Sequence, residues 1–290
     1  MDSMKKTSLA PKSVVWDVIK HTLHPVNAKI GAILLSLIIL SAIFAPLISQ
    51  YPINQINIAE NFSEPSLKHL FGTDSVGRDL FARILYGGRY SLVLGFAGAA
   101  FSTVVAIFLG CIAGYYGGFT ETLIMRIMDI LSSLPSILLC LLISSVLGAG
   151  FVNTIIALAV SQIPYNVRMM RSQVLTERSQ EYLEAAETIN CTKSRIIFRH
   201  MLPNAISPMI ICLAMGIGDN IALAASLSYI GLGVQPPTPE WGALLSDGRT
   251  YMLLHPYLII IPGIFIALTV FSTNLLGDGL RDALDPKLRR

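Results

Sequence analysis

The sequence is poor in charged residues. Asp, Glu, Lys and Arg make up 13% of its 290 residues, about half the share found in soluble domains, whereas 53% of the residues are hydrophobic. The length alone would allow two soluble domains, but this composition excludes them. It also excludes a disordered chain, which would be polar. The net charge of +3 is too small to indicate a nucleic-acid partner. We expect a membrane protein.

The sequence also lacks the motifs of catalysis and metal binding. Its four cysteines form no Cys-x-x-Cys pair, so neither a disulfide framework nor a zinc site is predicted. It has no Gly-x-x-x-x-Gly-Lys-Ser/Thr loop to bind nucleotide phosphates, no Gly-x-Ser-x-Gly elbow and no His-Glu-x-x-His helix. We therefore predict no catalytic residue, no metal site and no cofactor bound by this chain, and we expect it not to be an enzyme.

Long apolar runs predict membrane-spanning helices, each of which needs about 20 apolar residues. Residues 30–48 hold no charge. That run exceeds the apolar part of a signal peptide, about 7–15 residues, and no clear cleavage site follows it, so we expect an uncleaved span. The uncharged run 130–167 is too long for one span, and Gly148-Ala149-Gly150 predicts a turn in its middle. We predict an all-α, polytopic bundle whose six transmembrane helices cover about 30–49, 90–114, 122–147, 151–171, 204–230 and 256–279.

Lysine and arginine predict the orientation of these spans. If both termini are cytoplasmic, the inside segments contain 16 of the 21 basic residues and the outside segments contain 5. Basic residues gather on the cytoplasmic side, so we predict that both termini are cytoplasmic. Residues 1–29 would form an N-terminal cytoplasmic or interfacial segment, and residues 30–290 the transmembrane domain. Within the former, we expect an interfacial helix over 12–27 whose buried side consists of Val14, Val15, Val18 and Ile19.

Small residues and prolines within the spans predict how the helices pack. Small residues allow helix backbones to approach closely in lipid. They form Gly110-x-x-x-Gly114 on the second span and a stripe of Ala214, Gly218, Ala222 and Ser226 on the fifth. Kinks are expected at Pro135, Pro164 and Pro262. These features predict a helix bundle and do not identify a substrate.

The inside segment 173–203 predicts an elbow of two short helices. In the first helix, Leu183, Ala186 and Ile189 recur every three residues and should share one face. Asn190 can end this helix in the left-handed conformation. The elbow would present side chains to a soluble partner.

The second helix of the elbow begins after Thr192, which can cap it. It is expected to end at Pro203, where the fifth span follows, and His200 would help to close the elbow. One side of it is basic and the opposite side apolar, with Lys193, Arg195 and Arg199 against Ile196 and Ile197.

Five blocks of the sequence resemble a known family. Glu184-Ala185-Ala186, a turn residue four positions beyond Ala186, and Leu202-Pro203 are similar to the EAA loop of binding-protein-dependent ABC importer permeases. The other four blocks are similar to the C-type subunit of dipeptide, oligopeptide and nickel permeases. They are Phe71-Gly72-Thr73-Asp74 with Gly77-Arg78-Asp79, residues 227–233, Pro239-Glu240-Trp241-Gly242, and residues 274–286. The resemblance covers roughly residues 20–290.

The resemblance implies a transport subunit of an ATP-driven importer in a bacterial or archaeal plasma membrane. Its elbow would be the coupling helix that docks into a cytoplasmic ATPase. The residues implied in this contact are Glu184, Ala185, Ala186, Asn190, Cys191, Thr192, Arg195, Leu202 and Pro203. The implied partners are a second homologous permease, an extracytoplasmic solute-binding protein and two ATP-binding subunits, which would hold ATP and magnesium.

The chain departs from the family pattern at two positions. Asn190 stands where the family usually has Gly, but Asn tolerates the left-handed conformation better than most residues. Ala224 stands where many peptide permeases have an acidic residue. We expect neither departure to change the fold. The second departure, at Ala224, concerns the class of substrate.

Asp219 is the only acidic residue deep within the fifth span. Because a carboxylate inside a membrane is costly, it is a candidate for the translocation path, together with Ala222 and Ser226. The alternative is that Asp219 lies near a helix end or bonds to a neighbouring group. Asp129 is instead expected to pair with Arg126, one helical turn away.

Asp74, Arg78 and Asp79 are candidates on the outer face. There they would contact the external binding protein, or stabilise the outer loop by pairing and capping. Trp241, a further outer-face candidate, and Tyr257 fit an aromatic belt at the outer membrane interface.

The leading hypothesis is a permease for dipeptides or oligopeptides, and the alternative is a permease for nickel or a metal chelate. The absence of clustered His, Cys or Met in the spans disfavours a bare-metal site, whereas Ala224 points mildly toward the alternative. A secondary transporter working without ATP is a remote alternative, because only Asp219 lies well inside a span and no repeat is evident. An intramembrane enzyme is a third, remote alternative, because the sequence contains no pattern of residues that would supply a catalytic nucleophile or bind a metal.

Overall fold

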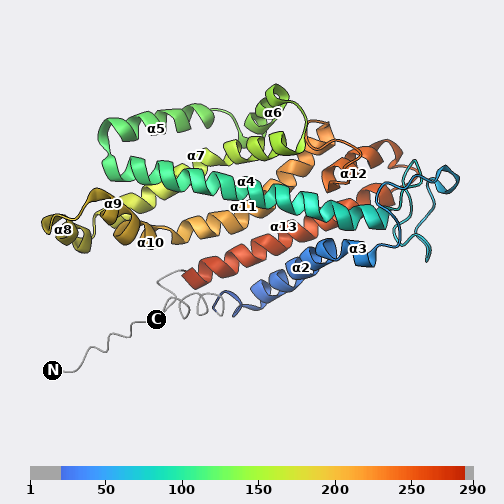
Figure 1. Ribbon diagram of the computed structural model, residues 1–290, viewed down its shortest axis with the longest axis horizontal. Helices are drawn as coiled ribbons and strands as arrows, with labels where there is room; N and C mark the ends of the chain where they lie inside the picture. Colours follow the sequence, from blue (N-terminus) through green and yellow to red (C-terminus); the bar gives the residue numbers. More distant parts are fainter. Residues whose placement is uncertain (1–20, 285–290) are drawn as a thin grey trace.

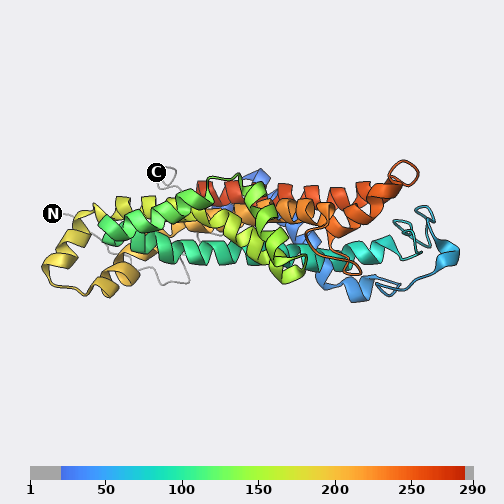
Figure 2. The same ribbon diagram turned by 90° about the horizontal axis from the view of Figure 1, so that it is seen from above.

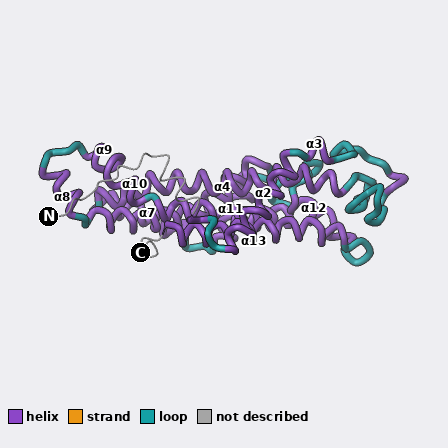
Figure 3. Tube along the Cα trace, turned by 90° about the horizontal axis from the view of Figure 1, so that it is seen from below, coloured by secondary structure: helices purple, strands orange, loops and turns teal. Residues whose placement is uncertain are grey.

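Long helices lying side by side build the structure, a computed structural model that describes residues 21–284 (for Glu187, the backbone only). Figures 1 and 2 show an elongated, flattened bundle, and Figure 3 shows most of the loops at its two ends. We call the end with residues 179–206 the elbow end and the end with residues 49–79 and 231–256 the loop end. The expected interfacial helix over 12–27 lies mostly outside the described residues, as do Val14, Val15, Val18 and Ile19.

The helices follow the chain in this order: α2 (Val26–Ile43), α3 (Ala45–Ile48), η1 (Ile58–Glu60), α4 (Leu80–Tyr116), α5 (Gly118–Leu131), α6 (Ser136–Leu147), α7 (Phe151–Arg178), α8 (Glu181–Thr188), α9 (Lys193–Arg195), η2 (Ile196–Met201), α10 (Leu202–Ala205), α11 (Ser207–Ile230), α12 (Trp241–Gly248), η3 (Arg249–Tyr251) and α13 (Tyr257–Leu284). Within the described range no strand forms, and one isolated bridge joins Thr73 to Asp79. The all-α prediction is confirmed.

α4 is the central helix and contacts α2, α7, α11 and α12. Its 37 residues correspond to about 55 Å, far more than one span requires. The helix begins ten residues before the predicted second span, because its charged residues find partners there. Arg89, for example, donates from Nε to the Ala42 carbonyl at 2.7 Å and from Nη2 to the Ile43 carbonyl at 2.8 Å, at the end of α2.

Small residues bring the helices together where the sequence predicts close packing. A Cβ on Gly110 would lie 2.6 Å from Met170 Cβ, and one on Gly114 would lie 2.6 Å from Val174 Cγ1 of α7. On α11, a Cβ on Gly218 would lie 2.3 Å from Thr273 Oγ1 of α13. Larger side chains at these positions would push α4 from α7 and α11 from α13.

The predicted kink at Pro135 is a complete break. α5 ends at Leu131, α6 begins at Ser136, and the two helices meet at 84°. Proline cannot donate a backbone hydrogen bond, and it disfavours helix in the residue before it, so a new helix starts directly after Pro135. Pro164 and Pro262 lie inside the continuous helices α7 and α13.

Four of the described helices are long and apolar enough to cross a membrane alone, namely α2, α4, α11 and α13, and the α5–α6 pair would be a fifth span. α7 has the length but carries many polar residues. The turn at Gly148-Ala149-Gly150 separates α6 from α7 as predicted. The six-span count and the cytoplasmic termini stay predictions.

Candidate translocation cavity and coupling elbow

A cavity of about 1050 Å³ opens between α7 and α11 and extends to the end of α13. Its size matches the upper range of small-ligand sites. The wall is apolar over much of its surface but also carries hydroxyl and amide side chains, which are supplied by Ser136, Ser161, Gln162, Tyr165, Asn166, Gln173, Ser207 and Ser226. The cavity can therefore bind a polar molecule by hydrogen bonds.

Two charged residues line this cavity, Asp219 from α11 and Arg281 from α13. Both side chains are exposed in the chain. Within residues 21–284, neither of them makes a hydrogen bond or an ion pair. This geometry disfavours the alternative that Asp219 is bonded to a neighbouring group of its own chain.

Gln162 and Asn166 join the cavity wall to the helix behind it. Asn166 Nδ2 donates to Ser102 Oγ of α4 at 3.1 Å, and Ser102 Oγ lies 3.5 Å from Gln162 Oε1. A Cβ on Gly216 would lie 3.3 Å from that same Oε1, so α11 packs directly against the amide. Our sequence reasoning missed both residues. The available signal was a pair of amides four residues apart around Pro164, in an otherwise apolar stretch.

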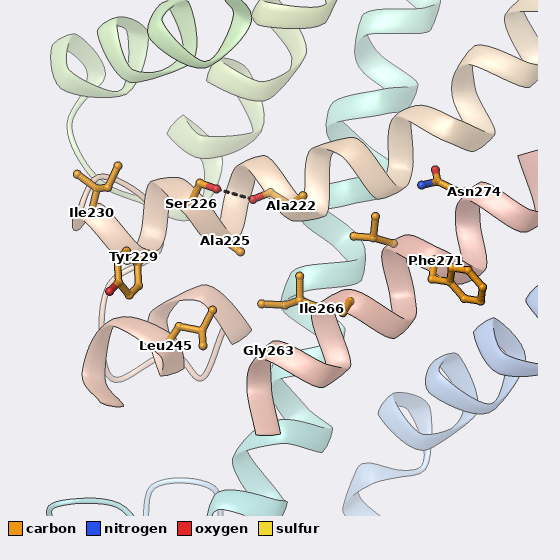
Figure 4. Close-up of a pocket in the computed structure, with 12 residues that line it drawn as sticks. Ala222, Ala225, Ser226, Tyr229, Ile230, Leu245, Gly263, Ile266, Phe271 and Asn274 are labelled. Atoms are coloured by element: carbon orange, nitrogen blue, oxygen red, sulfur yellow. Dashed lines mark hydrogen bonds between the residues drawn. The ribbon is translucent and has the colours of Figure 1, made fainter. Parts of the chain in front are cut away.

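A second cavity, of about 670 Å³, lies between α11, α12 and α13 and is mostly apolar. Figure 4 shows Ala222, Ala225 and Ser226 on α11 and Ile266 on α13 around it. Ala222 and Ser226 line both cavities. Ser226 Oγ donates to the Ala222 carbonyl at 2.9 Å, so its hydroxyl is already engaged. These two path candidates therefore form the ridge that separates the cavities.

The elbow has the predicted turn between its two helical parts. Asn190 has a φ of 61°, in the left-handed region, and the Cys191 N–H donates to the Ala186 carbonyl at 3.1 Å. Thr192 precedes the second helix with an extended backbone, but its side chain makes no capping hydrogen bond, contrary to prediction. Asn190 therefore takes the left-handed position at which the family that the sequence resembles usually has glycine.

Apolar contacts hold the elbow together. Leu183 and Ala186 are buried, as are Ile196 and Ile197 from the second part. Ile189 is 76% exposed, so the prediction that it shares their face is wrong. The reason is that α8 ends at Thr188, and Ile189 belongs to the turn rather than to the helix.

The second part of the elbow does not end at Pro203. The chain continues from α9 through the π-helical turn η2 into α10, and Pro203 lies in the first turn of α10, where its missing N–H is tolerated. Asn204 Nδ2 donates at 2.9 Å both to the His200 carbonyl and to Tyr182 Oη. Tyr182 Oη donates to Glu177 Oε2 at 2.6 Å, and burial together with Glu177 raises the pKa of Tyr182.

The elbow's surface carries exposed side chains that no described residue engages. Glu184, Ala185, Thr192 and Arg195 are exposed, Cys191 and Leu202 are half-buried, and Pro203 is exposed. The implied coupling residues thus lie at the elbow end and are separate from the cavity.

Asp129 bonds to a different partner from the one predicted. Its Oδ1 accepts from Arg168 Nη2 of α7 at 2.9 Å, and no ion pair with Arg126 forms among the described residues. The pair therefore joins α5 to α7, rather than stabilising one turn of α5.

At the loop end, the predicted outer-face carboxylates are engaged by their own chain. Asp74 accepts hydrogen bonds from the Val76 and Arg78 N–H groups at 3.0 and 2.9 Å and from Arg78 Nε at 2.6 Å. Asp79 caps α4 by accepting from the Ala82 N–H at 2.8 Å, and it lies 2.8 Å from His69 Nδ1. The geometry favours pairing and capping for both.

His69 and its neighbours extend this hydrogen-bonded loop. His69 Nε2 lies 3.2 Å from Glu60 Oε2, and Glu60 also bonds to Lys68. The hydrogen bonds from Lys68 and His69 hold the pKa of Glu60 below its ordinary value. Tyr257 Oη donates to the Thr73 carbonyl at 3.0 Å, which joins α13 to the same loop.

Trp241 is 1% exposed, which contradicts its predicted place in an aromatic belt. Its Nε1 donates to the Ile84 carbonyl at 3.0 Å, and a Cβ on Gly88 would lie 3.1 Å from its ring. No local sequence pattern indicates that the glycines of α4 leave space for an indole. Glu240, directly before it, is also buried and caps α12 through the Gly242 and Ala243 N–H groups at 2.9 Å each.

Arg83 was not predicted as a site residue and is completely buried. Its guanidinium lies 3.9 Å from Asp74 Oδ2 and 4.0 Å from Asp247 Oδ2, and Nη1 donates to Asn54 Oδ1 at 3.4 Å. Burial raises the pKa of Asp247 more than Arg83 and Arg78 lower it. This cluster joins α4 to α12 and the loop.

The comparisons with known proteins agree with this architecture. A family model described as the binding-protein-dependent transport system inner membrane component matches residues 106–290, and a model of the N-terminal transmembrane domain of oligopeptide transport permease C matches residues 24–65. The chain belongs to this family. It is a multi-pass membrane permease with a transport role, and the predicted C-type importer permease is confirmed.

Relatives of this permease resemble it over most of its length. The dipeptide transport system permease protein DppC of Alkalihalophilus pseudofirmus is 44% identical over 90% of the chain and 86% of the relative. The glutathione transport system permease protein GsiD of Escherichia coli is 44% identical over 90% of the chain and 87% of the relative. A chain of the MetNI methionine ABC transporter has a similar fold, with a TM-score of 0.57 and 18% identity over 70% of this permease and 97% of that chain.

Proposed function

We propose that this chain is the permease subunit of an ATP-driven importer for dipeptides and other short peptides. The observation that carries the proposal is the 44% identity to permeases named for dipeptide and glutathione transport. The polar cavity beside Asp219 supports it, because it offers hydrogen-bonding groups to a peptide within an otherwise apolar bundle. Asp219, Ala222 and Ser226 would line the path.

In this proposal a second, homologous permease covers the open side of the cavity. Two cytoplasmic ATP-binding subunits, which hold ATP and magnesium, bind the elbow, and an extracytoplasmic solute-binding protein delivers substrate at the loop end. Both termini are then cytoplasmic. Glu184, with its exposed neighbours in the elbow, transmits closure of the ATPases to the bundle, which moves as packed bodies between outward- and inward-facing states.

The function is tested by uptake in cells that lack the gene and in their parent. The substrates are a labelled dipeptide, a longer peptide and a nickel chelate, each with and without collapse of cellular ATP. We expect the deletion to abolish ATP-dependent dipeptide uptake and the restored gene to recover it. Loss of nickel-chelate uptake alone would replace the peptide assignment, and peptide uptake that continues without ATP would contradict an ABC importer.

A further inference from the structure

Among residues 21–284, Asp219 and Arg281 are the only charged residues that line the polar cavity. A carboxylate without a partner inside a membrane protein is unstable unless something neutralises or solvates it. The cavity thus offers one anionic and one cationic group, with neutral amides and hydroxyls elsewhere on the wall. A molecule with a cationic group facing Asp219 and an anionic group facing Arg281 would complement the cavity.

Helix packing gives the spacing of the two groups. Gly218 meets Thr273 and Gly277 meets Met215, so α11 and α13 run antiparallel and Asp219 lies near the level of Thr273. Arg281 is eight residues further along α13, which corresponds to about 12 Å along the axis. Helical side chains tilt toward the N-terminus of their own helix, so in this antiparallel pair Asp219 and Arg281 tilt toward each other and shorten that gap.

We propose that Asp219 binds the free α-ammonium group of the transported peptide and that Arg281 binds its terminal carboxylate. This inference rests on the proposed function. An extended residue spans about 3.3–3.6 Å, so a peptide of two to four residues covers the distance between the two side chains. The Gln173 amide and Gln162 Nε2, which no described residue engages, are then available to the peptide backbone. The permease would thus recognise the two charged termini of a short peptide without selecting for its side chains.

The cavity contains its own reporter of occupancy. Cys212 lines it and is partly exposed, whereas Cys191 is partly exposed in the elbow and Cys111 and Cys140 are buried. In the purified, complete transporter, alkylation of Cys212 by a maleimide measures whether a peptide occupies the cavity. Alkylation of the same sample after denaturation, when a peptide can protect no cysteine, serves as the internal control.

We would compare trialanine, N-acetyl-trialanine and trialanine amide as protecting peptides. Trialanine should slow the alkylation of Cys212 in the folded transporter and leave its alkylation after denaturation unchanged. Blocking either terminus should raise the half-protecting concentration about tenfold or more, because a charge-assisted hydrogen bond is lost. Equal protection by blocked and free peptides would overturn the inference, as would the absence of any protection in a transporter that imports trialanine.

Variants assign each terminus to its residue. Asp219→Asn should remove the preference for a free amino group and keep the preference for a free carboxylate, and Arg281→Gln should do the reverse. Asp219→Glu should retain the preference. Asp278→Asn is the matched control, because Asp278 is an exposed carboxylate of α13 that does not line the cavity. A wild-type transporter that imports no peptide would refute the proposed function itself, whereas normal uptake without terminal preference would refute only this inference.

Discussion

The loop end and the polar cavity both contain carboxylates and arginines, but these side chains are arranged differently in the two regions. At the loop end, Asp74 accepts three hydrogen bonds and Asp79 caps a helix, and both are buried. In the cavity, Asp219 is exposed, and no residue between 21 and 284 bonds to it. A buried carboxylate is stable only when its oxygens are hydrogen-bonded. The loop-end carboxylates therefore serve the fold, and Asp219 is available to a ligand.

This comparison predicts that substitutions at the loop end destabilise the protein, whereas substitutions in the cavity and the elbow change transport alone. The largest effect is expected for Trp241→Ala. Removing a fully buried indole leaves a large void, so we expect the free energy of unfolding to fall by about 3–5 kcal/mol. A thermal-unfolding midpoint of the purified permease measures it.

Trp241→Phe is the control, because it keeps most of the packing and loses the hydrogen bond to Ile84. Its expected loss is smaller than that of Trp241→Ala. An unchanged midpoint for Trp241→Ala would contradict the burial of Trp241 and favour the position at the membrane interface that we predicted from the sequence.

The next largest effect is expected for Asp79→Asn. The amide weakens the cap on α4 and points an N–H group toward a buried neighbour, so we expect a loss of about 1–3 kcal/mol. Thermal unfolding measures this loss, with Glu64→Gln as the control. Glu64 is an exposed carboxylate of the same loop, and its substitution should change stability by no more than about 0.5 kcal/mol. Equal effects of the two variants would contradict the structural role of Asp79.

A substitution on the elbow surface is expected to impair coupling to ATP hydrolysis without reducing the stability of the permease. Glu184 is exposed on α8, so Glu184→Arg should leave the unfolding midpoint unchanged, while peptide uptake falls and ATP hydrolysis no longer depends on substrate. The measurement is the ratio of peptide imported to ATP hydrolysed in reconstituted vesicles. Glu181→Arg, at an exposed position on the same helix, is the control for charge alone. Normal uptake by Glu184→Arg would contradict its coupling role.

What could be predicted from the sequence depended on local rules. The apolar runs of α2, α11 and α13, the turn at Gly148-Ala149-Gly150 and the left-handed Asn190 each follow from a few neighbouring residues. Close packing at Gly110 and Gly114 followed from their spacing. The EAA resemblance identified the family, but the coupling roles that it implies stay predictions.

The errors arose where distant residues decide the outcome. Asp129 bonds to Arg168, 39 positions away, rather than to its helical neighbour. Trp241 donates a hydrogen bond to a carbonyl 157 positions away, and no local sequence pattern predicts the space that its ring occupies. Gln162 and Asn166 acquire their role only when α11 packs against α7. Contacts of this kind are set by tertiary packing, which periodicity and propensity do not contain.

The smallest effect on stability is expected for Asp219→Asn, the same chemical change as at Asp79. Because Asp219 bonds to no described residue, its neutralisation breaks no hydrogen bond and removes a poorly solvated charge. We expect the unfolding midpoint of the purified permease to stay the same or to rise slightly, within about 0.5 kcal/mol. A loss as large as that of Asp79→Asn would mean that Asp219 has a structural partner in the folded permease. In that case the difference between the two regions would disappear, and Asp219 would join the carboxylates that hold the bundle together.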